Sequence, residues 1–308
     1  MSEQTRQGFW REAFALQGSI APNMLPLVAV FGGIAALLCA LAWQIEQIFE
    51  VRIGVDVTPH ELAGAALGLL LVLRTNAGYD RWWEARKLWG GFVDRSRNFV
   101  ISALAYGPAS ATWRDDLVRW AAAYPHVARH SLRGEGPGDE VLRLLGRERW
   151  ERVAAAEHMP AYVALQLAHL LRQACELLGM NRFAFLQVDR ERALLIDNYG
   201  GCERIRNTPL PRVYSIKIRQ FLFLFLLTLP IALLHRLGSD WLVPLITMLV
   251  AYPLLSLDQI GVELENPFAV ERLSHLPLVG IATTIEGNLL ALREEVRPSD
   301  QVDGVNAS

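Results

Sequence analysis

The stretch Met24–Ile45, MLPLVAVFGGIAALLCALAWQI, decides the fold class of this chain. It contains no charged residue, and its apolar side chains fall on every face of a helix rather than on one stripe. A helix of roughly 20 residues is long enough to cross the hydrocarbon core of a bilayer. The stretch therefore predicts a membrane-spanning helix; the alternative is a buried core helix of a soluble protein.

Three further apolar blocks lie along the chain. Two of them, Phe221–Leu234 and Trp241–Leu257, are separated only by a short polar turn. The third, Leu62–Leu73, has 12 residues, which is too few to face lipid across a whole bilayer. It can still cross if its polar continuation from Arg74 onward is shielded by protein or water. The blocks together predict two helical hairpins with both chain ends on the same side.

The overall composition argues against several classes of protein. Apolar residues make up 52% of the 308 residues, and the formal net charge is −2, which disfavours nucleic acid as a partner. Cys39, Cys175 and Cys202 have no CxxC or zinc-like spacing, so reduced thiols are expected. The sequence contains no P-loop, no GxGxxG and no evident Ser/His/Asp arrangement. We therefore expect neither an enzyme nor a bound cofactor.

The positions of Lys and Arg predict the orientation in the membrane. Of the 30 basic residues, 23 lie between Arg74 and Arg219, whereas the tips of the two hairpins hold only Arg52 and Arg236. Cytoplasmic segments carry an excess of positive charge. We therefore expect both chain ends and the long middle segment to be cytoplasmic.

The middle segment has the apolar spacing of helices over Trp113–Arg133, Pro160–Leu178 and about Phe183–Tyr199. In the first of these, His126 and His130 lie four residues apart and share a helix face. An HxxxH pair can bind zinc, but no Glu follows the first His, so this is not a metalloprotease motif. We expect two solvated surface histidines and no metal site.

Three apolar residues of the second block, Ala65, Leu69 and Leu73, are spaced four apart and form one helix face. In a single chain such a face is ordinary packing surface. Repeated around a symmetric ring, it would line a narrow apolar throat, which can gate ions by dewetting.

The residues that follow, Arg74–Gly90, read RTNAGYDRWWEARKLWG. This motif resembles the signature of bacterial bestrophins. PLPRVYS at Pro209–Ser215 and ENPF at Glu265–Phe268 occur in the matching order, so the resemblance covers nearly the whole chain. The signature residues are Arg74, Asn76, Tyr79, Asp80, Arg81, Trp82, Trp83 and Glu84.

The resemblance implies an all-α integral membrane protein that forms a homopentameric ion channel in a bacterial inner membrane. It implies four transmembrane helices per subunit, a large cytosolic helical region and a central pore. The implied segments are a cytosolic N-terminal segment 1–23, transmembrane helix 24–45, a pore-lining helix with its continuation 59–90, a cytosolic helical region 91–217, two transmembrane helices within 218–260, and a cytosolic C-terminal segment 261–308.

The resemblance also implies two constrictions. The family's neck of three apolar rings falls on Ala65, Leu69 and Leu73, and the small Ala65 implies a wider outer ring than is usual in the family. A second, cytosolic aperture falls on Phe183 by its spacing from the PLPRVYS motif. Read without the family, Phe183 is an ordinary core aromatic.

Calcium binding is a further property of animal bestrophins, and this chain matches it poorly. Glu263 and Asn266 occupy two helper positions of that site, but the acidic run after ENPF is replaced by Ala269-Val-Glu-Arg272. Calcium prefers six to eight oxygen ligands, so one Glu beside an Arg is a poor site. We expect only a weak remnant of the site, with Glu263 and Glu265 as intersubunit or solvated charges.

The expected function is conduction of small monovalent ions, and we favour cations over anions by family analogy alone. The expected partners are these ions, further copies of the chain and the lipid bilayer. The Trp and basic residues after Arg74 are expected to pack against other helices rather than to bind nucleic acid. The alternative function is a non-conducting membrane scaffold or signalling protein that binds partners on its cytosolic helices.

Overall fold

The computed structural model describes residues 8, 14–15, 18–50, 54–234, 236–237 and 239–295. These residues form helices and connecting segments with no β-strand among them, which confirms the all-helical prediction. They divide into two compact units. The first unit comprises residues up to Trp82, 209–267 and 271–275, and the second comprises 83–208, 268–270 and those from Leu276. The predicted segments 1–23 and 261–308 lie partly outside the described residues.

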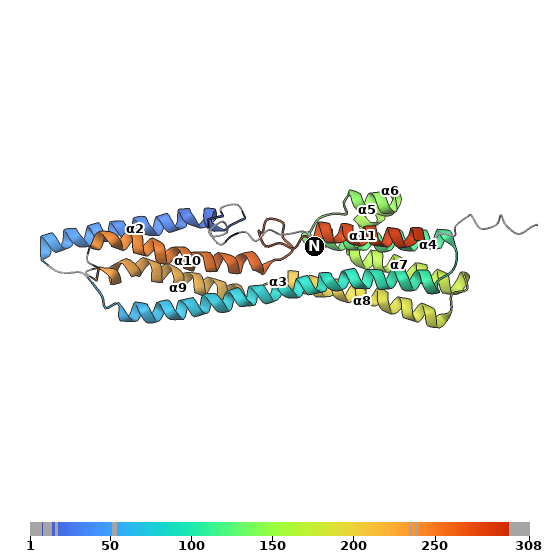
Figure 1. Ribbon diagram of the computed structural model, residues 1–308, viewed down its shortest axis with the longest axis horizontal. Coiled ribbons are helices and arrows are strands. Elements are labelled where there is room, and N and C mark those ends of the chain that lie inside the picture. Colours follow the sequence, from blue (N-terminus) through green and yellow to red (C-terminus); the bar gives the residue numbers. More distant parts are fainter. Residues whose placement is uncertain are drawn as a thin grey trace, which may run out of the picture. The chain divides into compact units, whose positions relative to one another are not determined.

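The first unit is a bundle of long apolar helices (Figure 1). It contains α2 (Ala21–Phe49), the N-terminal part of α3 (Thr58–Tyr106), α9 (Arg212–Leu233), the short 3₁₀ helix η1 (Asp240–Leu242) and α10 (Val243–Glu265). Helix α10 packs against α2 and α9, and α2 also contacts α9. Four helical segments, Ala21–Phe49, Thr58–Tyr106, Arg212–Leu233 and Asp240–Glu265, are long and apolar enough to cross a membrane. The four predicted spans are therefore present as helices.

The core of this bundle is made by apolar side chains from all four long helices. Leu67 and Leu71 of α3 are fully buried in it. Lipid tails are as apolar as these side chains, so close packing rather than removal from water holds the helices together. The other buried members are Val28, Phe31, Ile218, Leu222, Phe225, Leu226, Leu229, Ala251 and Leu255.

Helix α3 is continuous for 49 residues and contributes to both units. It begins at Thr58, one residue before the predicted segment 59–90, and Asp56 Oδ1 accepts a hydrogen bond from the Thr58 backbone N–H at 3.2 Å. It passes through Gly90 and Gly91 without a break. A Cβ atom at Gly91 would lie 2.9 Å from the Asn198 side chain, so glycine allows helix α8 (Arg182–Asn207) to approach closely. The predicted boundary between residues 90 and 91 falls inside this helix.

The second unit is built around α4 (Ala111–Arg133), which is buried along most of its length. It contacts α5 (Asp139–Leu145), α7 (Met159–Leu177), α8 (Arg182–Asn207) and α11 (Leu278–Glu295), and α6 (Arg147–Ala155) packs on α5 and α7. The three helices predicted in this region are present. Helices α5, α6 and α11 were not predicted, although Leu278, Ala282, Ile285 and Leu289 of α11 follow the helical period.

Candidate functional site

The outer face of α3 in the first unit carries the three predicted neck residues. Leu69 and Leu73 are 61% and 50% exposed in the single chain, and Ala65 is also exposed. Leu67 and Leu71, on the opposite face, are fully buried. Helical spacing separates these two sets of side chains. One face of α3 therefore packs within the chain, and the face with the neck residues does not.

Two further apolar residues, neither of them predicted, extend this face. Leu62 lies three residues before Ala65, Val72 lies three after Leu69, and both are exposed. The helical period itself would have found them. Asn76, three residues after Leu73, is exposed and changes the face from apolar to polar. We refer to Leu62, Ala65, Leu69, Val72 and Leu73 as the neck face.

Three charged side chains from three helices meet in the first unit. Arg74 of α3 is only 2% exposed, and its Nη1 donates a hydrogen bond to Oδ1 of Asp258 on α10. Oδ2 of Asp258 accepts from Nε of Arg219 on α9 at 2.9 Å. Charges at membrane depth are costly and generally pair with one another. We refer to Arg74, Asp258 and Arg219 as the arginine–aspartate cluster.

Two glycines bring α3 and α10 together beside this cluster. A Cβ atom at Gly78 would lie 3.1 Å from Leu264 Cβ and 3.3 Å from the Gly261 carbonyl oxygen. A Cβ atom at Gly261 would lie 3.4 Å from both Cγ and Nε of Arg74. The absence of a side chain at Gly78 thus permits close helix contact. At Gly261 it leaves room for the arm of Arg74.

The aromatic part of the signature attaches α3 to the segment that follows α10. Trp82 stacks on Tyr79 with ring centroids 6.2 Å apart, and its Nε1 donates to the Ser274 carbonyl oxygen at 2.7 Å. Arg81 Nε donates to the Glu265 carbonyl oxygen at 3.3 Å. These contacts agree with the packing role predicted for the signature. Its remaining residues, Asn76, Asp80, Trp83 and Glu84, are exposed in the single chain.

Glu263 is buried and bonded within the chain, so the expectation of an intersubunit or solvated charge was wrong for this residue. Its Oε2 accepts from the Leu273 backbone N–H at 2.9 Å, and its Oε1 accepts from Gln259 Nε2 at 3.0 Å. Arg272 Nη1 lies 3.7 Å from the same Oε1. An arginine thus neutralises the carboxylate that a calcium site would use, while Asn266 is exposed.

The side chains of the described residues include no group of three or more His, Cys, Asp or Glu placed to hold a metal ion. The three cysteines, Cys39, Cys175 and Cys202, carry free thiols. Burial raises the pKa of Cys202 to about 12, so this thiol stays protonated.

Phe183 lies at the start of α8 in the second unit. Oδ1 of Asn181 caps this helix by accepting from the Phe183 backbone N–H at 2.8 Å. The Phe183 side chain is 83% exposed, which excludes its interpretation as a core aromatic. Leu186, three residues later on the same helix, is also exposed. The N-terminal end of α8 therefore carries apolar side chains that are exposed in the single chain.

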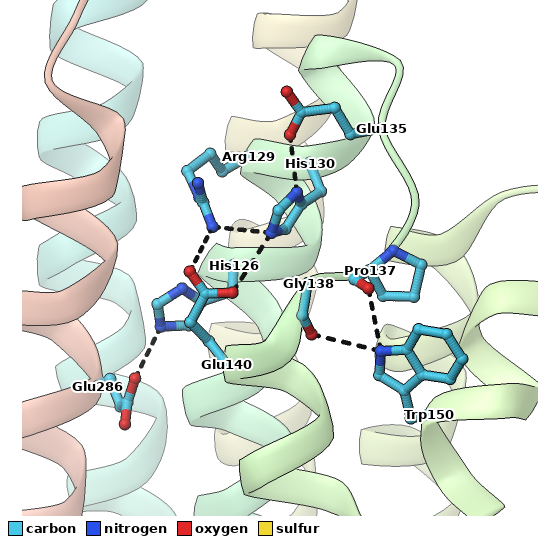
Figure 2. Close-up of polar contacts among 9 residues, drawn as sticks. All are labelled: His126, Arg129, His130, Glu135, Pro137, Gly138, Glu140, Trp150 and Glu286. Carbon is cyan, nitrogen blue, oxygen red and sulfur yellow. Dashed lines mark hydrogen bonds and ion pairs between the residues drawn. The ribbon is translucent and has the colours of Figure 1, made fainter. Parts of the chain in front are cut away.

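The two histidines of α4 are buried, so the prediction of solvated surface histidines was wrong (Figure 2). His126 is 1% exposed, and its Nε2 lies 2.9 Å from Oε2 of Glu286 on α11. Oε1 of Glu286 pairs with Arg143 Nη1 at 2.7 Å. Burial lowers the pKa of His126, and the neighbouring Glu286 partly opposes this effect.

His130 is held by the loop and helix that follow α4 (Figure 2). Its Nδ1 lies 2.9 Å from Glu135 Oε2, and its Nε2 lies 3.6 Å from Glu140 Oε2. Arg129 Nη2 is 2.7 Å from His130 Nε2 and 2.9 Å from Glu140 Oε1. We refer to His126, Arg129, His130, Glu135, Glu140, Arg143 and Glu286 as the histidine cluster.

Comparison with known proteins agrees with the signature motif. The family model of the bacterial/fungal bestrophin protein matches residues 1–291. A voltage-dependent anion channel-forming protein of Ralstonia nicotianae is 34% identical over 265 residues, which cover 85% of each protein. The voltage-dependent anion channel-forming protein YneE of Escherichia coli K12 is 30% identical over 298 residues, covering 96% of this chain and 95% of that protein.

The fold agrees with a solved structure from the same family. The crystal structure of a bacterial bestrophin homologue from Klebsiella pneumoniae matches with a TM-score of 0.80 at 26% identity, covering 88% of this chain and 98% of the other. On the family model, the relatives and this likeness, the chain belongs to the bacterial and fungal bestrophin family.

Proposed function

We propose that this chain is one subunit of a homopentameric ion channel of a bacterial inner membrane, with α3 lining the pore. Membership of the bestrophin family and the channel names of its relatives support ion conduction. One observation carries the proposal: Ala65, Leu69 and Leu73 lie exposed on a helix whose other face packs within the chain. Five copies of this face around one axis form an apolar neck.

The neck is a barrier to water because its side chains are apolar. An apolar constriction dewets and so blocks ions without binding them. Asn76 and Asp80, one and two turns after Leu73 on α3, are exposed and polar, so water fills the pore beyond the neck. This also accounts for the short apolar block of α3, because its continuation faces water rather than lipid. Ala65 gives the first ring a wider opening than the two leucine rings.

A second constriction is formed by Phe183 at the cytosolic end of the pore. Its exposed ring and the exposed Leu186 on the same helix face support this role. In this arrangement segments 24–45 and 218–260 span the membrane beside the pore-lining segment 59–90. Segments 1–23, 91–217 and 261–308 lie in the cytosol, which the concentration of Lys and Arg between Arg74 and Arg219 supports.

The names of the relatives favour anions over the cations that the sequence analysis favoured. We therefore propose that the channel conducts small monovalent anions. The measurement is the reversal potential in planar bilayers under a KCl gradient. A reversal potential near the chloride equilibrium value supports anions, and one near the potassium value restores the original expectation.

The neck is tested in the same bilayers with the double variant Leu69→Ala/Leu73→Ala. Removing both leucine rings weakens the dewetting barrier, so we expect conductance or open probability to rise by at least about twofold. The matched control is Leu245→Ala/Leu249→Ala, which removes two exposed leucines at the same spacing from α10. Equal currents in the neck variant and the wild type would remove Leu69 and Leu73 from the neck.

The alternative function, a non-conducting scaffold or signalling protein, makes the opposite prediction for the wild type. Purified protein that gives no single-channel current at any potential or salt concentration would end the channel proposal.

A further inference from the structure

We propose that Arg74 is a positioning residue for the neck: held by Asp258, its guanidinium fixes the rotation of α3 so that Leu69 and Leu73 face the pore. The inference rests on the proposed function, because it assigns the neck to α3. Arg74 itself lies on the packed side of the helix and does not touch the conducted ion.

The bond that holds Arg74 is directional and buried. Arg74 is 2% exposed, and its Nη1 donates to Asp258 Oδ1 on α10. The Asp258 carboxylate is 10% exposed, and its other oxygen accepts from Arg219 Nε of α9 at 2.9 Å. A hydrogen-bonded ion pair prescribes the positions of both partners. The bond between Arg74 and Asp258 therefore sets the position of the Arg74 guanidinium relative to α10.

Apolar contacts alone do not prescribe a rotation of α3 in the same way. Leu67 and Leu71 pack against other apolar side chains, and apolar attraction has no preferred direction. Lipid is as apolar as these side chains, so a helix that rotates in the membrane does not lose contact with apolar surroundings. The ion pair of Arg74 favours one rotation of α3 about its axis, which the apolar contacts alone do not.

The sequence position of Arg74 connects this bond to the neck. Arg74 directly follows Leu73, and successive residues of an α-helix differ by about 100° around its axis. Leu73, Leu69 and Ala65 therefore lie about 100°, 140° and 180° around α3 from Arg74. With Arg74 held toward α10, all three neck side chains are turned away from the packed side. A rotation of one residue position would replace Leu73 in the lumen by a neighbour.

The helix contact beside the cluster is shaped for the arm of Arg74. Gly261 of α10 leaves space for it, because a Cβ atom there would lie 3.4 Å from Arg74 Cγ and Nε. Gly78, one turn after Arg74 on α3, lies against Leu264 and the Gly261 carbonyl oxygen. The ion pair and the close backbone contact thus hold the same short section of α3.

Arg219 provides a matched control for Arg74. Both guanidiniums donate to the same carboxylate, but the Arg219 side chain is 53% exposed and belongs to α9. Arg74→Gln leaves Asp258 paired with Arg219, and Arg219→Gln leaves it paired with Arg74. The two variants have the same net charge and the same chemical change. They differ in whether the pore-lining helix has lost its ion pair.

The experiment uses the full-length chain in lipid vesicles and planar bilayers, with Cys39, Cys175 and Cys202 replaced by Ala. Cysteine is placed either at Leu73, on the neck face, or at Leu71, on the buried face. Leu73 is the neck residue next to the exposed polar Asn76, so a charged, water-soluble thiosulfonate reagent reaches it from the water-filled side of the neck. In the otherwise wild-type channel, we expect Leu73→Cys to react at least about tenfold faster than Leu71→Cys, because the buried position reacts only after local opening.

Arg74→Gln is expected to reduce this labelling ratio and to change the unitary conductance by about twofold or more. Arg74→Lys, which keeps the charge, is expected to retain most of both values. Arg219→Gln is expected to leave both within about twofold of the wild type. Unitary conductance is measured on assembled channels, so a variant that only lowers the yield does not change it.

The inference is overturned if Arg74→Gln and Arg219→Gln give the same labelling ratio and the same conductance. A different pair of results would end the channel proposal and leave the positioning role intact. In that case the wild type carries no current, and the labelling ratio changes with Arg74→Gln but not with Arg219→Gln. If Arg74→Gln does not assemble, Asp258→Glu replaces it, since it keeps every charge and lengthens the acidic arm by one methylene. It is expected to lower the labelling ratio, and an unchanged ratio would overturn the inference.

Discussion

The arginine–aspartate cluster of the first unit and the histidine cluster of the second each contain a buried carboxylate with two partners. Asp258 accepts from Arg74 and Arg219, and Glu286 pairs with His126 and Arg143. The partners differ in whether they can lose their positive charge when the carboxylate is replaced by a neutral group. An arginine does not lose its proton in a protein, whereas a histidine can become neutral. Among these four partners, His126 is the one that can change its charge near neutral pH, and burial lowers its pKa.

The largest expected effect is that of Asp258→Asn on the first cluster. The variant leaves the buried Arg74 cation without its counter-charge, and breaking a buried ion pair in this way costs about 3–5 kcal/mol. We expect a correspondingly lower free energy of unfolding of the detergent-solubilised protein, measured by thermal or denaturant unfolding. The control is Asp56→Asn, which makes the same change at an exposed carboxylate, where Asn can still cap α3. Equal stability of Asp258→Asn and this control would contradict the assignment of Arg74 as a buried cation.

The matching change in the second cluster, Glu286→Gln, is expected to cost less. Arg143 is 59% exposed and can turn toward water, and His126 can remain neutral and hydrogen-bonded to the new amide. The loss is then that of a buried hydrogen-bonded acceptor, about 1–3 kcal/mol. The same unfolding measurement ranks the two variants. A larger loss for Glu286→Gln than for Asp258→Asn would reverse the comparison between the clusters.

The spans and three of the five residues of the neck face could be predicted because they depend on local sequence. The uncharged run Met24–Ile45 and the spacing of Ala65, Leu69 and Leu73 contain the relevant information within a few turns. Such patterns indicate which residues share a face. In the structure Ala65, Leu69 and Leu73 share one exposed face, which periodicity alone could not distinguish from packing surface.

The charge clusters could not be predicted in the same way, because their partners are far apart in the sequence. Asp258 directly follows the apolar block Trp241–Leu257, and its partner Arg74 is 184 residues away. His126 was expected on the solvated surface together with His130. Its partner Glu286 lies 160 residues later, on the unpredicted α11. No local pattern indicates which distant acid faces a given cation.

The smallest expected effect is a dependence of the free energy of unfolding on pH, which arises from His126 in the histidine cluster. Burial holds the folded-state pKa of His126 below its unfolded value of about 6.5. Between these two values the unfolded chain binds more protons than the folded one. The free energy of unfolding therefore decreases as the pH falls below about 6.5, by at most about 1.4 kcal/mol per pH unit. The groups that face His126 are Glu286 and, through charge, Glu140 and Arg129.

The measurement is the pH dependence of unfolding of the wild type and of His126→Gln, which keeps a hydrogen-bonding side chain without the titration. We expect the stability difference between pH 7 and pH 5.5 to shrink by about 1 kcal/mol in the variant. The control is His158→Gln, which makes the same substitution at an exposed histidine. An unchanged pH dependence in His126→Gln would mean that Glu286 compensates fully for burial. His126 would then make no net contribution to the pH dependence of stability.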